Sequence, residues 1–470
     1  MSTHATPVDT RAINDLEERF RGTVLRPPDE DYDAARAVWN GLIDTRPAIV
    51  ARCQGAADVA NCLTFAQDHA LPVSIRGGGH HQSGSALVED GLVLDLSEMT
   101  SVHVDTDART VRVEPGGRVR DVLIETQHYG LATPTGSAGD VGIAGSTLGG
   151  GIGWIRRKHG LGIDALRSVD VVTSDGTLVR ASPDQHEDLF WAVRGGGGNF
   201  GIITSFEFEC YEVGPIVAGL GVFYPGDVAE EVLEAYADLT HETSDEVTTL
   251  ALYGHVPPLP PIPDDLAGQH AVAIMGCSLG DIEEGQEALQ PFRTISEPLL
   301  DMSEPMPYLL LHQLGTMMFP EGRRYCHRSA FVDTLSKSLI NLVIEHAGDA
   351  PSSLSGIGVW HLGGAIATVG NDETAFPYRD KHYMVITEAN WEADSDDTEN
   401  LEWARETDDR LRELGGVGAY GGFTGVSERA GEEFRDRVYG DNVERLAHIK
   451  ATYDASNALT QNINIDPAAD

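Results

Sequence analysis

The sequence has little lysine, and almost all of its positive charge is arginine. Four lysines stand among 33 basic residues, whereas 74 acidic residues give a formal net charge of −41. A nucleic-acid-binding surface needs clustered basic residues to contact phosphates, and the sequence contains no such patch. We therefore exclude nucleic acid as a partner.

Cysteines are few and long apolar runs are missing. The five cysteines are odd in number and form no CxxC pair, so we expect neither a disulfide framework nor a metal site. No apolar stretch is long enough to cross a bilayer, and no membrane association is expected. Residues 1–20 have no apolar core, so we expect no signal peptide and a cytoplasmic protein.

The acidic residues are spread along the chain and are not gathered in a tail. Spread acid with little lysine is typical of a surface adapted to high salt, where ions screen the repulsion between like charges. We expect a halophilic protein, and a merely acidic mesophilic protein is the alternative.

Glycine, in contrast, is plentiful and gathers at residues 77–79, 149–151 and 195–198. The first cluster stands in SIRGGGHHQSG, residues 74–84, where two adjacent histidines follow it. Glycine lets the backbone approach a ligand closely, and successive backbone N–H groups can bind an anion. Tight turns would explain any one cluster. Three clusters in one half of the chain favour a large phosphate-bearing cofactor.

One glycine run imitates a nucleotide-binding motif. Residues 196–201 fit G-x-G-x-x-G, a pattern that binds dinucleotides only when a strand precedes it and a helix follows. Here residues 186–194 predict a helix and residues 202–209 predict a strand, which is the reverse order. We therefore reject a Rossmann site.

The pattern of predicted helices and strands changes near residue 213. Before this point, short strands and helices alternate with glycine loops; after it, long acidic helices such as 226–242 alternate with apolar strands. Such a pattern predicts a sheet with helices on one side. A final helix is expected over residues 428–454.

Four motifs resemble the FAD-linked oxidases of the berberine-bridge-enzyme-like group, within the vanillyl-alcohol-oxidase and p-cresol-methylhydroxylase superfamily. They are RGGGHHQSG, TLGGGIGW, DLFWAVRGGGGNFGIIT and YDASNALTQNI, and they follow the family's order across nearly the whole chain. The resemblance implies a two-domain α+β fold of the p-cresol methylhydroxylase type. Its parts would be an FAD-binding domain over 1–213 with a core of about 45–213, a substrate-binding domain over 214–427 with an antiparallel sheet covered by helices, and a segment 428–470 that returns to the FAD-binding domain.

The resemblance also implies FAD as the cofactor. In the family, the first glycine loop cradles the pyrophosphate and its histidine bonds covalently to the flavin 8α-methyl, which by position is His80. His81 falls outside the motif and is expected near the adenine or the solvent. Family members with a second tether carry a cysteine where this chain has Ala138, so the resemblance implies a single tether, or none if His80 is not flavinylated, and oligosaccharide substrates are less expected. The implied FAD-binding residues are Arg76, Gly77, Gly78, Gly79, His80, Gly142, Gly145, Ser146, Asn199, Gly201, Ile202 and Asn462.

Two residues are candidates for catalysis. The family often places a tyrosine in a Y-x-N segment, and this chain keeps Tyr420 without the asparagine. A tyrosine with its ordinary pKa of about 10 would need a neighbouring cation to act as a base, and a packed aromatic residue is the alternative. His361 lies on a predicted strand of the second domain, where a lone histidine is more often structural. Further pocket candidates are His327, Tyr325, Tyr378 and Arg379.

Three functions remain open at this point. The first is an FAD-dependent oxidoreductase that transfers a hydride from a substrate C–H, in a C–OH or C–N group, to flavin N5. Its partners would be a small-molecule substrate and oxygen or another electron acceptor. The second is a reductase that uses NAD(P)H, and the third is a flavin-binding protein without activity.

Overall fold

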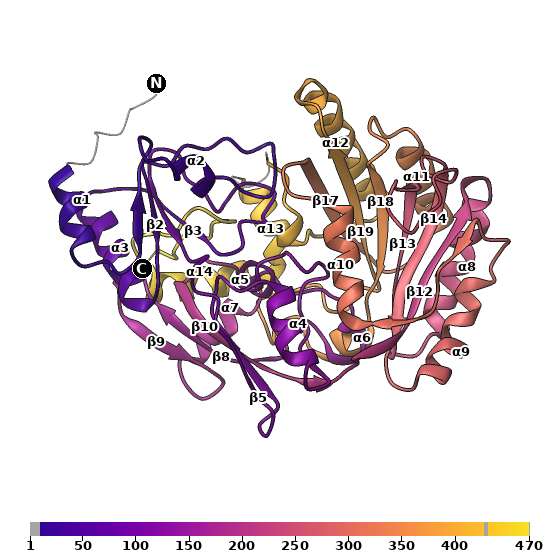
Figure 1. Ribbon diagram of the computed structural model, residues 1–470, viewed down its shortest axis with the longest axis horizontal. Coiled ribbons are helices and arrows are strands. Elements are labelled where there is room, and N and C mark those ends of the chain that lie inside the picture. The colour runs from indigo at the N-terminus through magenta and orange to yellow at the C-terminus, as the bar shows by residue number, and fades with distance from the viewer. Residues whose placement is uncertain (1–9, 427–430, 470) are drawn as a thin grey trace.

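The first half of the chain is built on two main sheets. The computed structural model describes residues 10–426 and 431–469 (Figure 1). A four-stranded sheet has the order β1-β2-β4-β3, and a five-stranded sheet has the order β5-β6-β10-β8-β9. The strands are β1 (Thr23–Leu25), β2 (Ile49–Arg52), β3 (Val73–Arg76), β4 (Leu92–Asp95), β5 (Val102–Asp105), β6 (Thr110–Val113), β8 (Leu166–Val172), β9 (Leu178–Ala181) and β10 (Ile202–Glu209), and β7 (Leu131–Ala132) pairs with β11 (Tyr211–Glu212).

Short helices connect these strands. The apolar positions of α3 (Ala56–Asp68) recur at helical spacing, so Val59, Cys62 and Leu63 are all buried. This helix ends before Pro72, which cannot continue it. The other helices of this half are α1 (Thr10–Glu17), α2 (Tyr32–Ala35), α4 (Val119–Gln127), α5 (Ile143–Leu148), α6 (Arg156–His159) and α7 (Glu187–Val193).

The order of α7 and β10 confirms that residues 196–201 are not a Rossmann motif. Helix α7 precedes the glycines and β10 follows them, whereas dinucleotide binding requires a strand before and a helix after.

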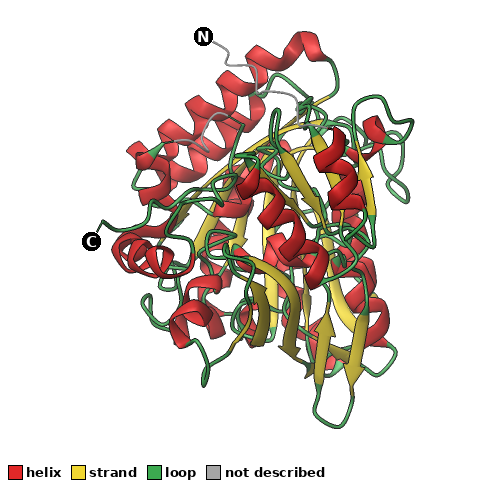
Figure 2. Cartoon of the chain, turned by 90° about the vertical axis from the view of Figure 1, so that its left-hand side faces the viewer, coloured by secondary structure: helices red, strands yellow, loops and turns green. Residues whose placement is uncertain are grey.

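The second half contains an eight-stranded sheet. Its order is β15-β12-β14-β13-β18-β19-β17, with β16 also paired to β12, and all of these pairs are antiparallel. Helices and strands occur together in both halves (Figure 2), so the expected α+β class is confirmed. The strands are β12 (Ile216–Pro225), β13 (Val247–His255), β14 (His270–Ser278), β15 (Leu300–Asp301), β16 (Pro305–Pro307), β17 (Arg324–Val332), β18 (Gly356–His361) and β19 (Tyr383–Trp391).

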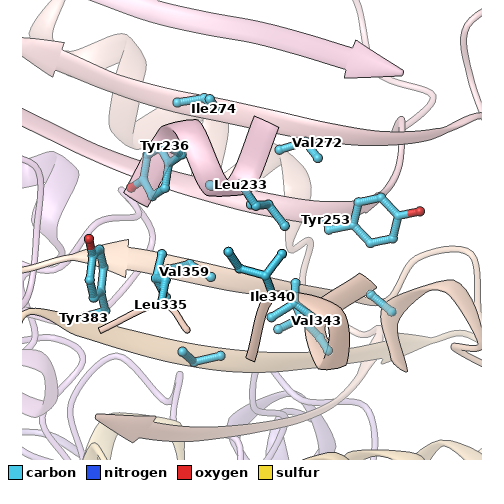
Figure 3. Close-up of a cluster of buried hydrophobic side chains, with 14 of the residues drawn as sticks. Leu233, Tyr236, Tyr253, Val272, Ile274, Leu335, Ile340, Val343, Val359 and Tyr383 are labelled. Carbon is cyan, nitrogen blue, oxygen red and sulfur yellow. The ribbon is translucent and has the colours of Figure 1, made fainter. Parts of the chain in front are cut away.

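Four helices cover one face of this sheet. They are α8 (Ala229–Glu242), α9 (Ile282–Arg293), α11 (Lys337–Gly348) and α12 (Asp397–Glu413), and the expectation of a sheet with helices on one side is confirmed. Leu233 of α8 and Ile340 of α11 belong to the same buried cluster as Val359 of the sheet (Figure 3). Trp391 and Trp403 also lie in this core. Helix α10 (Tyr308–Met318) does not belong to this layer, because it packs against α4 of the first half.

The C-terminal segment contains two helices where the sequence predicted one. Helices α13 (Glu432–Tyr439) and α14 (Val443–Tyr453) are separated by a short 3₁₀ turn over Gly440–Asn442. Gly440 has φ +52, a conformation that ends a helix and that glycine adopts without strain.

These helices pack into the first half of the chain. Phe434 and Leu446 join the same buried cluster as Val111 and Phe206 of the five-stranded sheet, and the C-terminal end lies on the side of α3 and β2 (Figure 1). The predicted boundary at 427–428 lies outside the described residues. Within the described ranges, no helix combines the length and the apolar character that a membrane span requires.

Candidate cofactor site and active site

A cavity of about 340 Å³ lies between the glycine loops, the eight-stranded sheet and the C-terminal segment. Residues from both ends of the chain line it, including Gly77 near one end and Ile463 near the other. Most of the residues predicted to bind FAD or substrate are brought together here. They are Gly77, Gly78, Gly79, His80, Gly142, Gly145, Ser146, Gly201, Ile202, Tyr420 and Asn462.

The glycines of this cavity are required for two different reasons. Gly78 and Gly142 touch each other, because a Cβ built on Gly78 would lie 2.6 Å from the Cα of Gly142. Gly145 and Gly198 face open space instead, since a Cβ on either would meet no atom within 4 Å. Bare backbone therefore lines the cavity, and this suits a cofactor whose pyrophosphate accepts hydrogen bonds from backbone N–H groups. The residues present thus fit FAD.

His80 is held on two sides in this cavity. Its Nε2 lies 3.2 Å from Oδ2 of Asp140, and its ring stacks on Trp39 with centroids 4.2 Å apart. Burial alone would raise the pKa of the Asp140 carboxyl. Hydrogen bonds from His80 and Thr316 lower the pKa by more than burial raises it, so it lies below its ordinary value. An ionised Asp140 accepts a hydrogen bond from the Nε2–H group of His80, and in this tautomer of His80 the Nδ1 atom carries a lone pair.

His81, which was expected near the adenine or the solvent, is partly exposed and also lines the cavity. Its Nε2 lies 2.9 Å from the carbonyl oxygen of Gly421, and its Nδ1 lies 2.7 Å from Oγ of Ser83. The ring therefore links the first glycine loop to the segment that carries Tyr420.

Arg76 and Asn199 do not line the cavity, although both were predicted to bind FAD. The Arg76 guanidinium donates to the carbonyl of Ala35 and supports the loop from outside. Asn199 is buried, and its Nδ2 donates to the carbonyls of Gly196 (2.9 Å) and Ile463 (3.1 Å). Both residues shape the cavity walls, and Asn199 joins the third glycine cluster to the C-terminal segment.

Tyr420 lines the cavity and is almost fully buried. Burial raises the pKa of Tyr420 to about 12, although the backbone N–H groups of Gly151 and Ile152 donate hydrogen bonds to its oxygen. The phenol is therefore neutral near pH 7, so it can donate a hydrogen bond but is not a base.

No sequence motif points to Glu388, which is the acidic group best placed for proton transfer. This residue of β19 lines the cavity and is 9% exposed. Burial raises the pKa of Glu388 to about 8. A shift of this size at a cavity marks a functional candidate. The available signal was one carboxylate inside the otherwise uncharged and fully buried run YMVITEANW.

Of the two candidate histidines on the sheet, His327 lines the cavity and His361 does not. His327 lines the cavity, its Nε2 lies 3.1 Å from Oδ1 of Asn390, and burial lowers its pKa to about 4. His361 lies away from the cavity, against the prediction of a catalytic role. Trp360 faces the cavity, and side chains alternate along a strand, so His361 faces the other side, where Arg157 lies 2.8 Å from its Nε2.

The three remaining candidates also lie outside the cavity lining. The Tyr325 hydroxyl donates to the carbonyl of Pro320, and the Tyr378 hydroxyl donates to that of Arg437. The buried Arg379 forms a two-point ion pair with Asp164. None of the five cysteines lines the cavity, whereas Ala138 does.

Known proteins resemble this chain in sequence over nearly its full length. A family model described as an FAD binding domain matches residues 47–182, and one described as "Berberine and berberine like" matches residues 408–466. (R)-6-hydroxynicotine oxidase of Paenarthrobacter nicotinovorans is 30% identical over 462 residues, which are 95% of this chain and 97% of that protein. The uncharacterised FAD-linked oxidoreductase YgaK of Bacillus subtilis is 29% identical over 96% of this chain and 98% of its own length.

Solved structures share the fold. 6-Hydroxy-D-nicotine oxidase from Arthrobacter nicotinovorans matches with a TM-score of 0.84 at 27% identity, over 96% of this chain and 98% of that one. BBE-like 1 of Physcomitrella patens matches with a TM-score of 0.86 at 23% identity, over 97% of this chain and 100% of that one. The predicted p-cresol methylhydroxylase type of fold is thereby confirmed. The chain belongs to the berberine-bridge-enzyme-like family of FAD-linked oxidoreductases, and FAD is its cofactor.

Proposed function

We propose that this protein oxidises a small molecule at a carbon that bears a hydroxyl or amine group, with Glu388 as the proton acceptor. The observation that carries the proposal is the buried carboxyl of Glu388, which lines the same cavity as the glycine loops. Bound FAD supplies a hydride acceptor, its N5 atom.

Proton handling falls to residues of this chain. A carboxylate with a pKa near 8 has enough basicity to take the proton of a substrate O–H or N–H, and roughly one tenth of it is ionised at pH 7, a fraction that grows as pH rises. Tyr420 remains a neutral phenol and can orient the same substrate group by a hydrogen bond. Glu388 would thus take the substrate proton, while bound FAD would supply the two-electron acceptor and oxygen or another acceptor would regenerate it.

We further propose that His80 tethers the FAD. Asp140 is the hydrogen-bond partner of Nε2 in the His80 ring. The lone pair is then on Nδ1, which supports Nδ1 as the nucleophilic atom. The glucooligosaccharide oxidase of Acremonium strictum, which shares the fold, carries an FAD with both a cysteinyl and a histidyl link. Here Ala138 lines the cavity and no cysteine does, which supports a single link.

Anaerobic mixing tests the direction of the reaction. Panels of alcohols and amines should bleach the oxidised flavin absorbance, and NADPH should not. The reverse result would support the reductase alternative, and a flavin that no donor reduces would support a binding protein without activity.

Acid precipitation tests the tether. The yellow colour should stay with the precipitated wild type and move to the supernatant in His80→Ala. A wild-type supernatant that contains all of the flavin would show that FAD is bound without a covalent link.

We also propose a cytoplasmic protein that works at high salt. The net charge of −41 supports the second point, because ions screen repulsion between surface carboxylates. Five free, buried cysteines support a reducing compartment. The melting temperature should rise from dilute buffer to molar KCl, and an unchanged value would contradict the adaptation to salt.

A further inference from the structure

A second cavity of about 150 Å³ adjoins the first one. The two cavities share Trp360, Phe319 and Glu388, so the side pocket begins where the candidate proton acceptor lies. Its floor is the face of the eight-stranded sheet opposite α8, α9, α11 and α12, and α10 and the loop around Pro257–Pro261 contribute the other walls.

Small residues on the sheet create this space. Gly221, Ala273 and Gly358 line the side pocket at positions where a core would carry a large side chain. A Cβ built on Gly221 would meet only the Cβ of Met302, at 4.0 Å. The strand neighbours of Gly221 and Ala273, Val222 and Ile274, belong to the packed cluster under the helices. The hollow is therefore confined to one face of the sheet.

Methionines supply much of the lining. The chain has eight methionines, and five of them line the side pocket: Met275, Met302, Met306, Met317 and Met318. Methionine is unbranched, flexible and polarisable, so it packs against apolar groups of different shapes.

Hydrogen-bonding side chains are sparse in this pocket. In the part of the chain that the structure describes, hydroxyl, imidazole and carboxyl groups come only from Ser137, His255 and Glu388. A sugar placed here would bury several hydroxyl groups without partners, which is costly. An alkyl or aryl group would gain from leaving water.

We propose that the substrate is amphiphilic: its hydroxyl or amine carbon lies beside Glu388 in the main cavity, and an apolar tail occupies the methionine-lined side pocket. This assignment of substrate class rests on the proposed oxidation at the same site. It distinguishes the protein from two structural neighbours, a chitooligosaccharide oxidase and a xylooligosaccharide oxidase.

Binding of methyl ketones to the holoenzyme tests the proposal. These compounds are analogues of an oxidised secondary alcohol, so they bind without being turned over. Isothermal titration calorimetry from butan-2-one to decan-2-one should show a Kd that falls about fourfold per added methylene until the pocket is full. A Kd that does not change with chain length, or tighter binding of xylobiose than of octan-2-one, would overturn the proposal.

Two variants locate the tail. Gly221→Leu should weaken binding of decan-2-one at least about tenfold and leave butan-2-one unchanged, because the added side chain fills only the side pocket. Gly221→Ala is the matched control, since its Cβ makes an ordinary contact. If Gly221→Leu fails to fold, Ala273→Leu blocks the same hollow from β14. Equal chain-length dependence in the wild type and a folded blocking variant would sink the proposal.

The calorimetry also separates this proposal from the oxidation on which it rests. Binding of a ketone needs no reduction of the flavin. If no alcohol or amine reduces the flavin while the chain-length dependence persists, the oxidation proposal fails and the apolar pocket stands as a binding site. If alcohols reduce the flavin while Kd is flat, only the amphiphilic substrate class fails.

Discussion

On β14, Val272 and Ile274 face the covering helices, whereas Ala273 between them faces the side pocket. The same contrast recurs on β18, where Val359 is packed in the core and Gly358 lines the side pocket. Since successive side chains of a strand point to opposite faces, one sheet can carry a close-packed core on one side and a hollow on the other. Stability and chemistry are thus assigned to alternate residues of the same strands.

The largest expected effect comes from the cavity face. Glu388→Gln removes the proton acceptor and should lower the rate of flavin reduction by about 10²- to 10⁴-fold. Anaerobic stopped-flow absorbance measures this rate with any substrate that reduces the wild type. The variant should be at least as stable as the wild type, because a buried ionisable group is lost. A rate within twofold of the wild type would remove Glu388 from the mechanism.

Substitutions on the sheet face that packs against the helices should instead lower stability and leave flavin reduction unchanged. Ile274→Ala leaves a cavity beneath the helices and should lower the free energy of unfolding by about 2–4 kcal/mol, as measured by urea titration. Ile274→Val is the control and should cost about 1 kcal/mol. Both variants should keep the wild-type rate of flavin reduction per folded molecule. A loss of that rate would show that the two faces are not independent.

A smaller effect is expected at Asp140, which contacts the His80 ring. Asp140→Asn keeps the shape of the side chain but loses the charge that fixes the His80 ring. Covalent attachment of added FAD to the apoprotein should slow about 10- to 100-fold, in the range typical of lost second-layer contacts. The measurement is the protein-bound absorbance in acid precipitates over time. Thr316→Val removes the hydroxyl that donates to the Asp140 carboxylate and accepts from its backbone N–H, but it keeps the charge of Asp140 and should slow attachment less.

The cavity face should also make the stability of the protein depend on pH. The pKa of Glu388 is raised to about 8 from an ordinary 4.5, so between these values the unfolded chain has released a proton that the folded chain still holds. By linkage, this group contributes a loss of stability as pH rises from about 4.5 to about 8, and no further loss above. Urea titrations across this range should therefore give a steeper decline for the wild type than for Glu388→Gln. Identical slopes would place the pKa of Glu388 near its ordinary value.

Sequence patterns predicted the elements that depend on residue type and on the spacing of apolar residues. The glycine clusters, the order of α7 and β10 and the helix-covered sheet followed from residue type and period. The break at Gly440 did not, because one glycine with positive φ divided a segment whose periodicity continued on both sides.

The candidate site was only partly predictable, because it depends on which face a residue occupies. His361 and Trp360 are adjacent in the sequence, and only the sheet's register decides that Trp360 faces the cavity. Glu388 gains its high pKa from burial by groups distant in sequence, which no motif encodes. The supporting roles of Asn199 and Arg76 likewise appear only once their partners are in place.

The cavity draws on both ends of the chain, and this has a consequence for biosynthesis. Gln461 to Ile463 line it, and Asn199 and Lys450 hold the backbone of this last segment in place. A ribosome releases these residues well after the glycine loops have emerged. FAD therefore meets a finished binding site only once residues 461–463 have emerged, so cofactor loading reports that the chain has been made at least this far. A chain that stops near residue 455 would lack one wall of the site and should be colourless.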